Sequence, residues 1–122
     1  MRRTAAAIAL VVLSALTLAG CGSKSSSPAT GPLPTKVIDI TFNGSSVTPN
    51  GTTIDVALGQ RIEFDVTADA PGEIHVHSSP AEQEFQYDKG TSTLDLKAIK
   101  TPGIVVIESH TLDKTIVQLE VR

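Results

Sequence analysis

The stretch RIEFDV, residues 61–66, indicates the fold class of this chain. Ile62, Phe64 and Val66 alternate with charged residues, so an extended backbone places the apolar side chains on one face and the charges on the other. This period of two is typical of a half-buried β-strand. We therefore expect residues 61–66 to form a strand with one face in a hydrophobic core.

Similar segments continue on both sides of this strand. Some alternate as clearly, others are weaker, and the last two are rich in β-branched residues. They are residues 37–42, 53–58, 73–77, 84–87, 93–97, 104–108 and 115–121. Turn-forming pairs lie between them, namely Asn43-Gly44, Asn50-Gly51, Pro71-Gly72, Lys89-Gly90 and Pro102-Gly103. No stretch has a convincing helical period, so the spacing predicts an all-β sandwich or barrel.

The order of these features resembles the cupredoxin-like Greek-key β-sandwich, particularly small bacterial lipoproteins that carry such a domain. The resemblance rests on VALGQRIEFDV at 56–66, GEIHVH at 72–77, Pro102-Gly103 before a strand, and the closing LEVR at 119–122. It spans most of residues 36–122 and implies a cupredoxin-like β-sandwich there.

The resemblance also implies where a metal would bind. Copper-carrying members use one histidine from a middle strand; a cysteine, a second histidine and usually a methionine follow near the strand after Pro-Gly. His75 or His77 matches the early ligand, and His110 lies near the late one. Ser109 stands near the cysteine position, and no methionine follows Met1. Without a thiolate, a blue-copper site and its electron transfer do not carry over.

The three histidines could still form another metal site. His75 and His77 are two apart on a predicted strand, so both leave the same face about 7 Å apart. His110 follows a strand that would run near the first in this fold. Glu108 is available as a carboxylate ligand or as an acceptor for an imidazole N–H. Nitrogen and oxygen ligands without sulfur suit Cu(II) or Zn(II), so the metal hypothesis names these four residues and copper or zinc.

Two structural interpretations compete with the metal hypothesis. The histidines can be polar side chains on a solvent face opposite Ile74 and Val76. Alternatively, a buried His75 can donate to Glu108 and hold two strands together. An enzyme is not expected, because neighbouring serine and histidine on a strand point to opposite faces and no catalytic motif occurs.

The N-terminal residues 1–20 have the layout of a secretory signal peptide. Arg2 and Arg3 precede an apolar run of about 15 residues, shorter than the roughly 20 that a membrane-spanning helix needs. Residues 18–21, LAGC, match the lipobox of bacterial lipoproteins. This resemblance implies cleavage between Gly20 and Cys21 and a diacylglycerol on Cys21. We expect a cell-membrane protein that is lipid-anchored and faces the extracytoplasmic side.

The rest of the chain divides into a tether and one domain. Residues 21–35 hold the lipidated cysteine and a Gly-, Ser- and Pro-rich segment that is expected to be flexible. Residues 36–122 are long enough for one small β-sandwich. With its only cysteine used for lipid, the domain is expected to contain no disulfide.

Charge narrows the class of partner. Removing Arg2 and Arg3 from the 10 basic residues leaves 8 against 13 acidic ones, a net charge of −5, which disfavours nucleic acid. Two functions remain. One is a lipoprotein that binds or buffers a metal such as copper through its histidines; the other is a non-catalytic envelope domain that binds a protein partner, with Ile104 and Val106 as the apolar surface to test.

Overall fold

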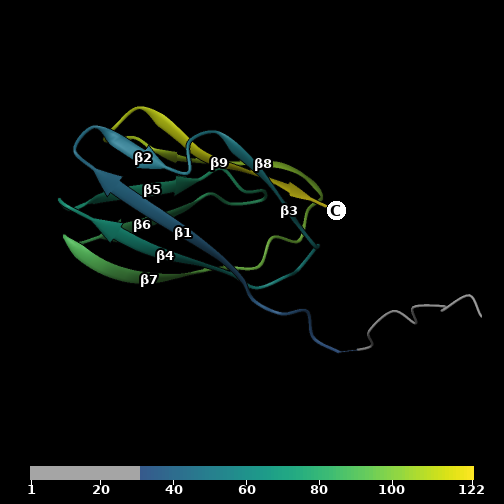
Figure 1. Cartoon of the computed structure of the whole chain (residues 1–122). Coiled ribbons are helices and arrows are strands. Elements are labelled where there is room, and N and C mark those ends of the chain that lie inside the picture. The colour runs from purple at the N-terminus through teal and green to yellow at the C-terminus, as the bar shows by residue number, and fades with distance from the viewer. Residues whose placement is uncertain (1–30) are drawn as a thin grey trace, which may run out of the picture. The chain divides into compact units, whose positions relative to one another are not determined.

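Residues 36–121 fold into two β-sheets that pack face to face (Figure 1). The structure is a computed structural model that describes residues 31–122. Its strands are β1 (Lys36–Asn43), β2 (Ser46–Thr48), β3 (Thr52–Val56), β4 (Ile62–Ala68), β5 (Gly72–Val76), β6 (Gln83–Tyr87), β7 (Gly90–Leu96), β8 (Gly103–Ser109) and β9 (Lys114–Val121). The predicted all-β sandwich is confirmed.

The two sheets contain four and five strands. One sheet has the order β2-β1-β4-β7, and the other has the order β3-β9-β8-β5-β6. Strands β1 and β4 pair in parallel, as do β3 and β9, whereas the remaining pairs are antiparallel. The chain crosses between the sheets after β2, β3, β4, β6 and β7. Because it leaves the five-stranded sheet after β6 and returns after β7, β8 pairs with β5 although the two are far apart in sequence.

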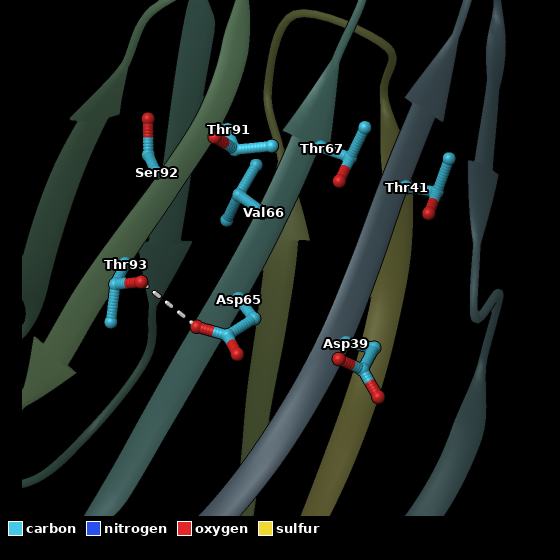
Figure 2. A pocket seen from close by; sticks show the side chains of 8 residues that line it. All are labelled: Asp39, Thr41, Asp65, Val66, Thr67, Thr91, Ser92 and Thr93. Carbon is cyan, nitrogen blue, oxygen red and sulfur yellow. Dashed lines mark hydrogen bonds between the residues drawn. The ribbon is translucent and has the colours of Figure 1, made fainter.

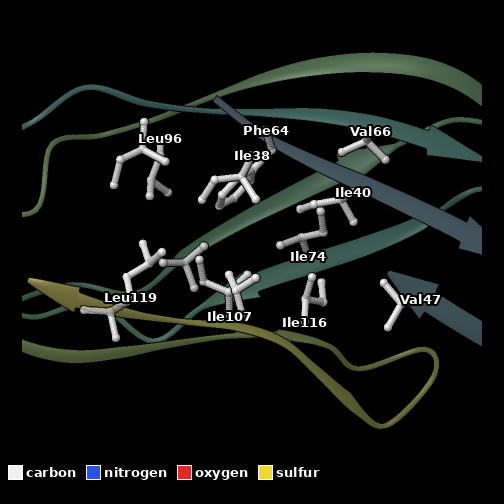
Figure 3. Packing of buried hydrophobic residues seen from close by; sticks show 14 of the residues in the cluster. Ile38, Ile40, Val47, Phe64, Val66, Ile74, Leu96, Ile107, Ile116 and Leu119 are labelled. Carbon is white, nitrogen blue, oxygen red and sulfur yellow. The ribbon is translucent and has the colours of Figure 1, made fainter. Parts of the chain in front are cut away.

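The core lies between the sheets and follows the alternating pattern (Figure 3). Phe64 at the centre of β4 is completely buried, and Ile74, Ile107 and Leu119 on the other sheet are equally inaccessible. Full burial of each such side chain contributes roughly 1.5–3 kcal/mol. The sheets are thus held together by the apolar face that the sequence pattern marks.

Strand β3 ends earlier than expected. The sequence predicted residues 53–58, but the strand stops at Val56 because a turn follows at once. The Gln60 backbone N–H donates to the carbonyl of Ala57 at 3.0 Å, and the Gln60 side chain accepts from the Ala57 N–H at 2.9 Å. Gly59 takes a positive φ of 76°, which glycine adopts without strain. The short β2 was not predicted at all.

The predicted signal peptide, Gly20, Cys21 and most of the tether lie outside the described residues. Within residues 31–122, no helix has the length and apolarity to cross a membrane.

Candidate metal centre

The three histidines meet on the outer face of the five-stranded sheet. Ile74 and Val76 of β5 are fully buried in the core, so alternation turns His75 and His77 to the opposite face. His110 follows β8, the neighbour of β5 in the sheet. One ring nitrogen from each histidine can be chosen so that all three lie within 4.8 Å of one another. Residues 35 positions apart thus converge on one small volume.

The loop between β8 and β9 fixes the position of His110. Ser109 is buried at the end of β8, and its hydroxyl oxygen accepts from the backbone N–H of Leu112 at 3.3 Å. The backbone N–H of Asp113 donates to the carbonyl of His110 at 3.3 Å, and Asp113 has a φ of 51°. Aspartate tolerates this left-handed conformation better than most residues. The tight turn therefore holds His110 beside β5.

His75 and His110 are in direct contact. The Nδ1 atom of His75 lies 3.1 Å from the Nε2 atom of His110, and the rings meet edge to face with centroids 4.6 Å apart. His75 is also stacked on His77, with centroids 4.4 Å apart. His75 is buried by these two rings, although it faces away from the core.

Glu82, at the end of the loop between β5 and β6, joins two of the rings. Its Oε2 atom lies 3.0 Å from His75 Nε2, and its Oε1 atom lies 3.1 Å from His77 Nδ1. An ionised carboxylate only accepts hydrogen bonds, so both of these nitrogens donate. The carboxylate therefore ties His75 and His77 together from one side.

Glu108 meets His77 from the other side. Its Oε2 atom lies 3.0 Å from His77 Nε2 and 4.0 Å from His110 Nε2. Thr115 donates its hydroxyl to Oε1 of Glu108 at 3.4 Å. The pairing of β8 with β9 shifts register between Ile107 and Glu108, and the extra residue, Ile116, lies on β9. This bulge brings Thr115 opposite Glu108.

The hydrogen bonds make His77 the positive centre of the cluster. Both of its ring nitrogens face carboxylate oxygens, and both can donate only when the ring is charged. The hydrogen bond to Glu82 is the main cause that raises the pKa of His77; Glu108 adds to it, while partial burial opposes it. The same bond from His77 lowers the pKa of Glu82, with a smaller contribution from His75.

The arrangement fits a borderline metal ion. Two nitrogens bound to one ion at 2.0–2.1 Å lie about 3 Å apart in tetrahedral or square geometry. The 3.1 Å between His75 and His110 and the 3.0 Å between His77 and Glu108 match this spacing. The three ligand nitrogens lie within 4.8 Å of one another, so the rings would have to move slightly closer together to share one ion. Three imidazoles and a carboxylate suit Cu(II) or Zn(II) rather than Cu(I), which prefers sulfur.

The alternative of a His75–Glu108 hydrogen bond is wrong. The two residues are Cα partners across β5 and β8, as that interpretation required. The carboxylate nevertheless reaches His77, because strand side chains lean along the strand, and His75 bonds to Glu82 and His110 instead. The interpretation as freely solvated side chains also fails for His75, which is buried.

Sequence reasoning missed Glu82. The signal was available in the hairpin formed by β5 and β6, where Val76 pairs with Gln83 and His75 pairs with Glu84. Continuing this register by one residue places Glu82 opposite His77, so both acids fall on the histidine face. The number of loop residues, which sequence alone did not fix, decides this pairing.

The outer face of the four-stranded sheet carries a different feature. A shallow hollow of about 410 Å³ lies across β1, β4 and β7, and Asp39, Asp65 and Thr67 are among the residues that line it (Figure 2). The hydroxyl of Thr93 donates to Asp65 at 3.0 Å. Each lining side chain except Val66 is a threonine, a serine or an aspartate.

Comparison with solved structures identifies the fold. An amicyanin mutant in its Cu(I) form matches with a TM-score of 0.53 and 11% identity, over 70% of this chain and 82% of that one. A second Cu(I) amicyanin mutant matches with a TM-score of 0.53 and 14% identity, over 77% and 88%. A purple cupredoxin from Nitrosopumilus maritimus matches with a TM-score of 0.52 and 12% identity, over 71% and 99%. The chain has the cupredoxin fold.

The likeness is one of fold and not of sequence. No family model and no curated protein matches the chain. Within this cupredoxin fold, Ser109 is buried on the core side of β8, whereas the histidines gather on the outside. The candidate metal centre is therefore built from a different surface than the position where the resemblance expects a thiolate.

Proposed function

We propose that this protein binds a Cu(II) or Zn(II) ion outside the cell through His75, His77, His110 and Glu108, and buffers or delivers it. The observation that supports this most is the convergence of the three imidazoles within 4.8 Å. Every histidine of the chain takes part. Four protein ligands would complete the coordination of a tetrahedral ion and leave no open position for a substrate, which is typical of a closed, non-catalytic site.

The hydrogen bonds of the cluster support reversible binding. The nitrogens and oxygens that would hold the ion already face one another in pairs across His75–His110 and His77–Glu108. Protons occupy these pairs in the metal-free cluster and leave when the ion binds. Little rearrangement of the rigid sheet is then needed to take up or release the ion.

The metal site is tested by titrating the full-length protein with Cu(II) or Zn(II) in a calorimeter and following thermal unfolding. A ligand that binds only the folded state at 100 times its Kd stabilises it by about 2.7 kcal/mol. His77→Ala should abolish both the heat of binding and the stabilisation. Thr67→Ala, on the exposed face of the other sheet, should change neither.

Two results would contradict the metal function. Wild-type protein that gives no binding heat and no thermal shift with either ion has no such site. Binding that survives unchanged in His77→Ala shows that the ion sits elsewhere.

The lipid anchor completes the proposal and has its own support. The LAGC sequence at 18–21 and the only cysteine of the chain coincide. A diacylated cysteine anchors firmly, because two acyl chains hold a protein where one does so marginally. Cys21→Ser should move the protein from the membrane fraction to the soluble fraction of a bacterial host; an unchanged distribution would refute the anchor.

A further inference from the structure

We propose that Glu82 is a positioning residue that selects the metal-binding nitrogens: Nδ1 on His75 and Nε2 on His77. The inference rests on the proposed function, since it assigns the atoms of the same site. It goes further, because it gives a role to a side chain outside the ligand set and predicts opposite tautomers for two histidines on one strand face.

The first step concerns where the protons lie. A neutral imidazole carries its proton on one nitrogen and offers the other as a lone pair. Glu82 faces Nε2 of His75 at 3.0 Å and Nδ1 of His77 at 3.1 Å. Both carboxylate oxygens need donors, so the protons stay on these two atoms and the opposite nitrogens become the ligands.

The second step concerns where those opposite nitrogens point. His75 Nδ1 faces Nε2 of His110 at 3.1 Å. His77 Nε2 faces the Oε2 atom of Glu108 at 3.0 Å. The nitrogens that Glu82 leaves free are therefore the ones beside the other two proposed ligands. With the alternative tautomers, the lone pairs would point at the oxygens of Glu82 instead.

The third step concerns how firmly Glu82 is placed. Ser78 is buried in the same loop and donates its hydroxyl to the carbonyl of Ala81 at 2.7 Å. The side chain of Gln83 donates to the Ser78 hydroxyl at 3.2 Å. These bonds hold the residues on both sides of Glu82, so its backbone is fixed although its side chain is more than half exposed.

Nuclear magnetic resonance of ¹⁵N-histidine-labelled full-length protein tests the assignment directly. In the metal-free protein, His75 should carry its proton on Nε2. With Zn(II) bound, His75 should keep the Nε2 proton and His77 the Nδ1 proton, while the other nitrogen of each ring binds the ion. Coordination through His75 Nε2 or His77 Nδ1 would overturn the inference. The metal-free spectrum is a separate test: a His75 proton on Nδ1 would overturn the inference whether or not Zn(II) binds, whereas a failure of Zn(II) to bind would refute the metal function itself.

Substitutions provide the second test. In Glu82→Gln, the amide can accept from one ring but donates to the other, and so places that ring's proton on its ligand nitrogen. Zn(II) affinity should fall about 10- to 100-fold, the usual loss when such a supporting partner is changed. In Glu82→Ala, water can accept from both rings, so the loss should be smaller. Glu84→Gln removes a charge at the neighbouring cross-strand position and should leave affinity unchanged.

The order of the two Glu82 variants separates a tautomer effect from simpler ones. If Glu82 acted only through its negative charge, Glu82→Gln and Glu82→Ala would be equally impaired. If it acted only by packing, the isosteric Glu82→Gln would bind better than Glu82→Ala. Either result would overturn the proposal, as would wild-type affinity in Glu82→Gln.

Discussion

The two outer faces of this sandwich are built on the same alternating pattern but differ in chemistry. On the four-stranded sheet, Thr41 is the Cα partner of both Thr48 and Thr67, and Thr67 is the partner of Thr91. This threonine face is a row of exposed hydroxyls that follows the regular pairing of β2, β1, β4 and β7. The histidine face of the other sheet gathers its groups at strand ends and loops, and its rings contact one another.

The contrast between the two faces indicates where a β-sandwich can concentrate reactive groups. In a regular ladder, side chains on one face stand about 5 Å apart, which keeps polar groups separate. Convergence on a single atom needs a departure from the ladder. The histidine face has two, the bulge beside Glu108 and the tight loop after Ser109. The threonine face has no comparable irregularity in its β1, β4 and β7 pairings.

The largest effect on stability is expected from a change in the packing between the two sheets, because both faces depend on it. Gly72 on β5 pairs with Tyr87 on β6, and a Cβ at this glycine would overlap the Tyr87 side chain. Tyr87 stacks on Phe42 of the opposite sheet with centroids 4.7 Å apart. Gly72→Ala should lower the free energy of unfolding by about 1–3 kcal/mol, measured by urea denaturation.

The matched control for this substitution is Gly31→Ala. An added Cβ there meets no atom within 4 Å, and Gly31 is not among the glycines with positive φ, so stability should stay unchanged. Equal stability of Gly72→Ala and wild type would show that the Tyr87 ring can move away from β5 without cost, and that the two faces depend on each other less than the packing indicates.

A smaller effect distinguishes the faces by pH. The pKa of His77 is raised in the folded protein, so its contribution is complete below the ordinary histidine value of about 6.5 and is lost as pH rises through the folded pKa. Metal-free protein should therefore lose stability between mildly acidic and alkaline pH, by less than about 1 kcal/mol because His77 is partly exposed.

Urea midpoints from pH 6 to 9 test this dependence. His77→Gln should flatten the profile, since all three histidines belong to one face and the threonine face has none. A profile that keeps its full slope in His77→Gln would assign the pH dependence to another group. The lowered pKa of Glu82 predicts a separate loss of stability as pH falls below about 4.5, which Glu82→Gln should reduce.

The smallest effect concerns the threonine face alone. Asp39 and Asp65 are Cα partners on neighbouring strands, and like charges opposite each other destabilise a sheet. Asp39→Asn should raise the free energy of unfolding by about 0.3 kcal/mol at low salt and by less in high salt. Zn(II) affinity should not change. If Asp39→Asn instead lowered the free energy of unfolding, the Asp39 carboxylate would make a favourable interaction that outweighs its repulsion from Asp65.

Most of the fold follows from local alternation. The pattern of Ile62, Phe64 and Val66 is enough to choose the buried face of β4, because each residue of the wrong face would place a charge in the core. The sheet partners are less local. Nothing within residues 37–42 specifies that β1 pairs in parallel with β4, since that choice depends on how all strands cover the core together.

The candidate site was predictable in composition and only partly in contacts. Alternation and the expected nearness of two strands predicted that His75, His77 and His110 lie together, and the structure places them together. The partner of each ring depended on one-residue details of loop length and register. Glu82 was missed, and Glu108 was expected beside His75 as an alternative, for this same reason.

The position of the histidine cluster makes it separable from the rest of the molecule. Residues 75–82 supply two rings and the positioning carboxylate, and residues 108–110 supply the remainder, all on the side turned away from the apolar interior. Drift in these two short segments can therefore create, retune or erase the cluster without repacking the interior. For protein engineering, the β5–β6 hairpin could be transferred to other antiparallel scaffolds, provided that a neighbouring loop supplies the groups that residues 108–110 supply in this protein.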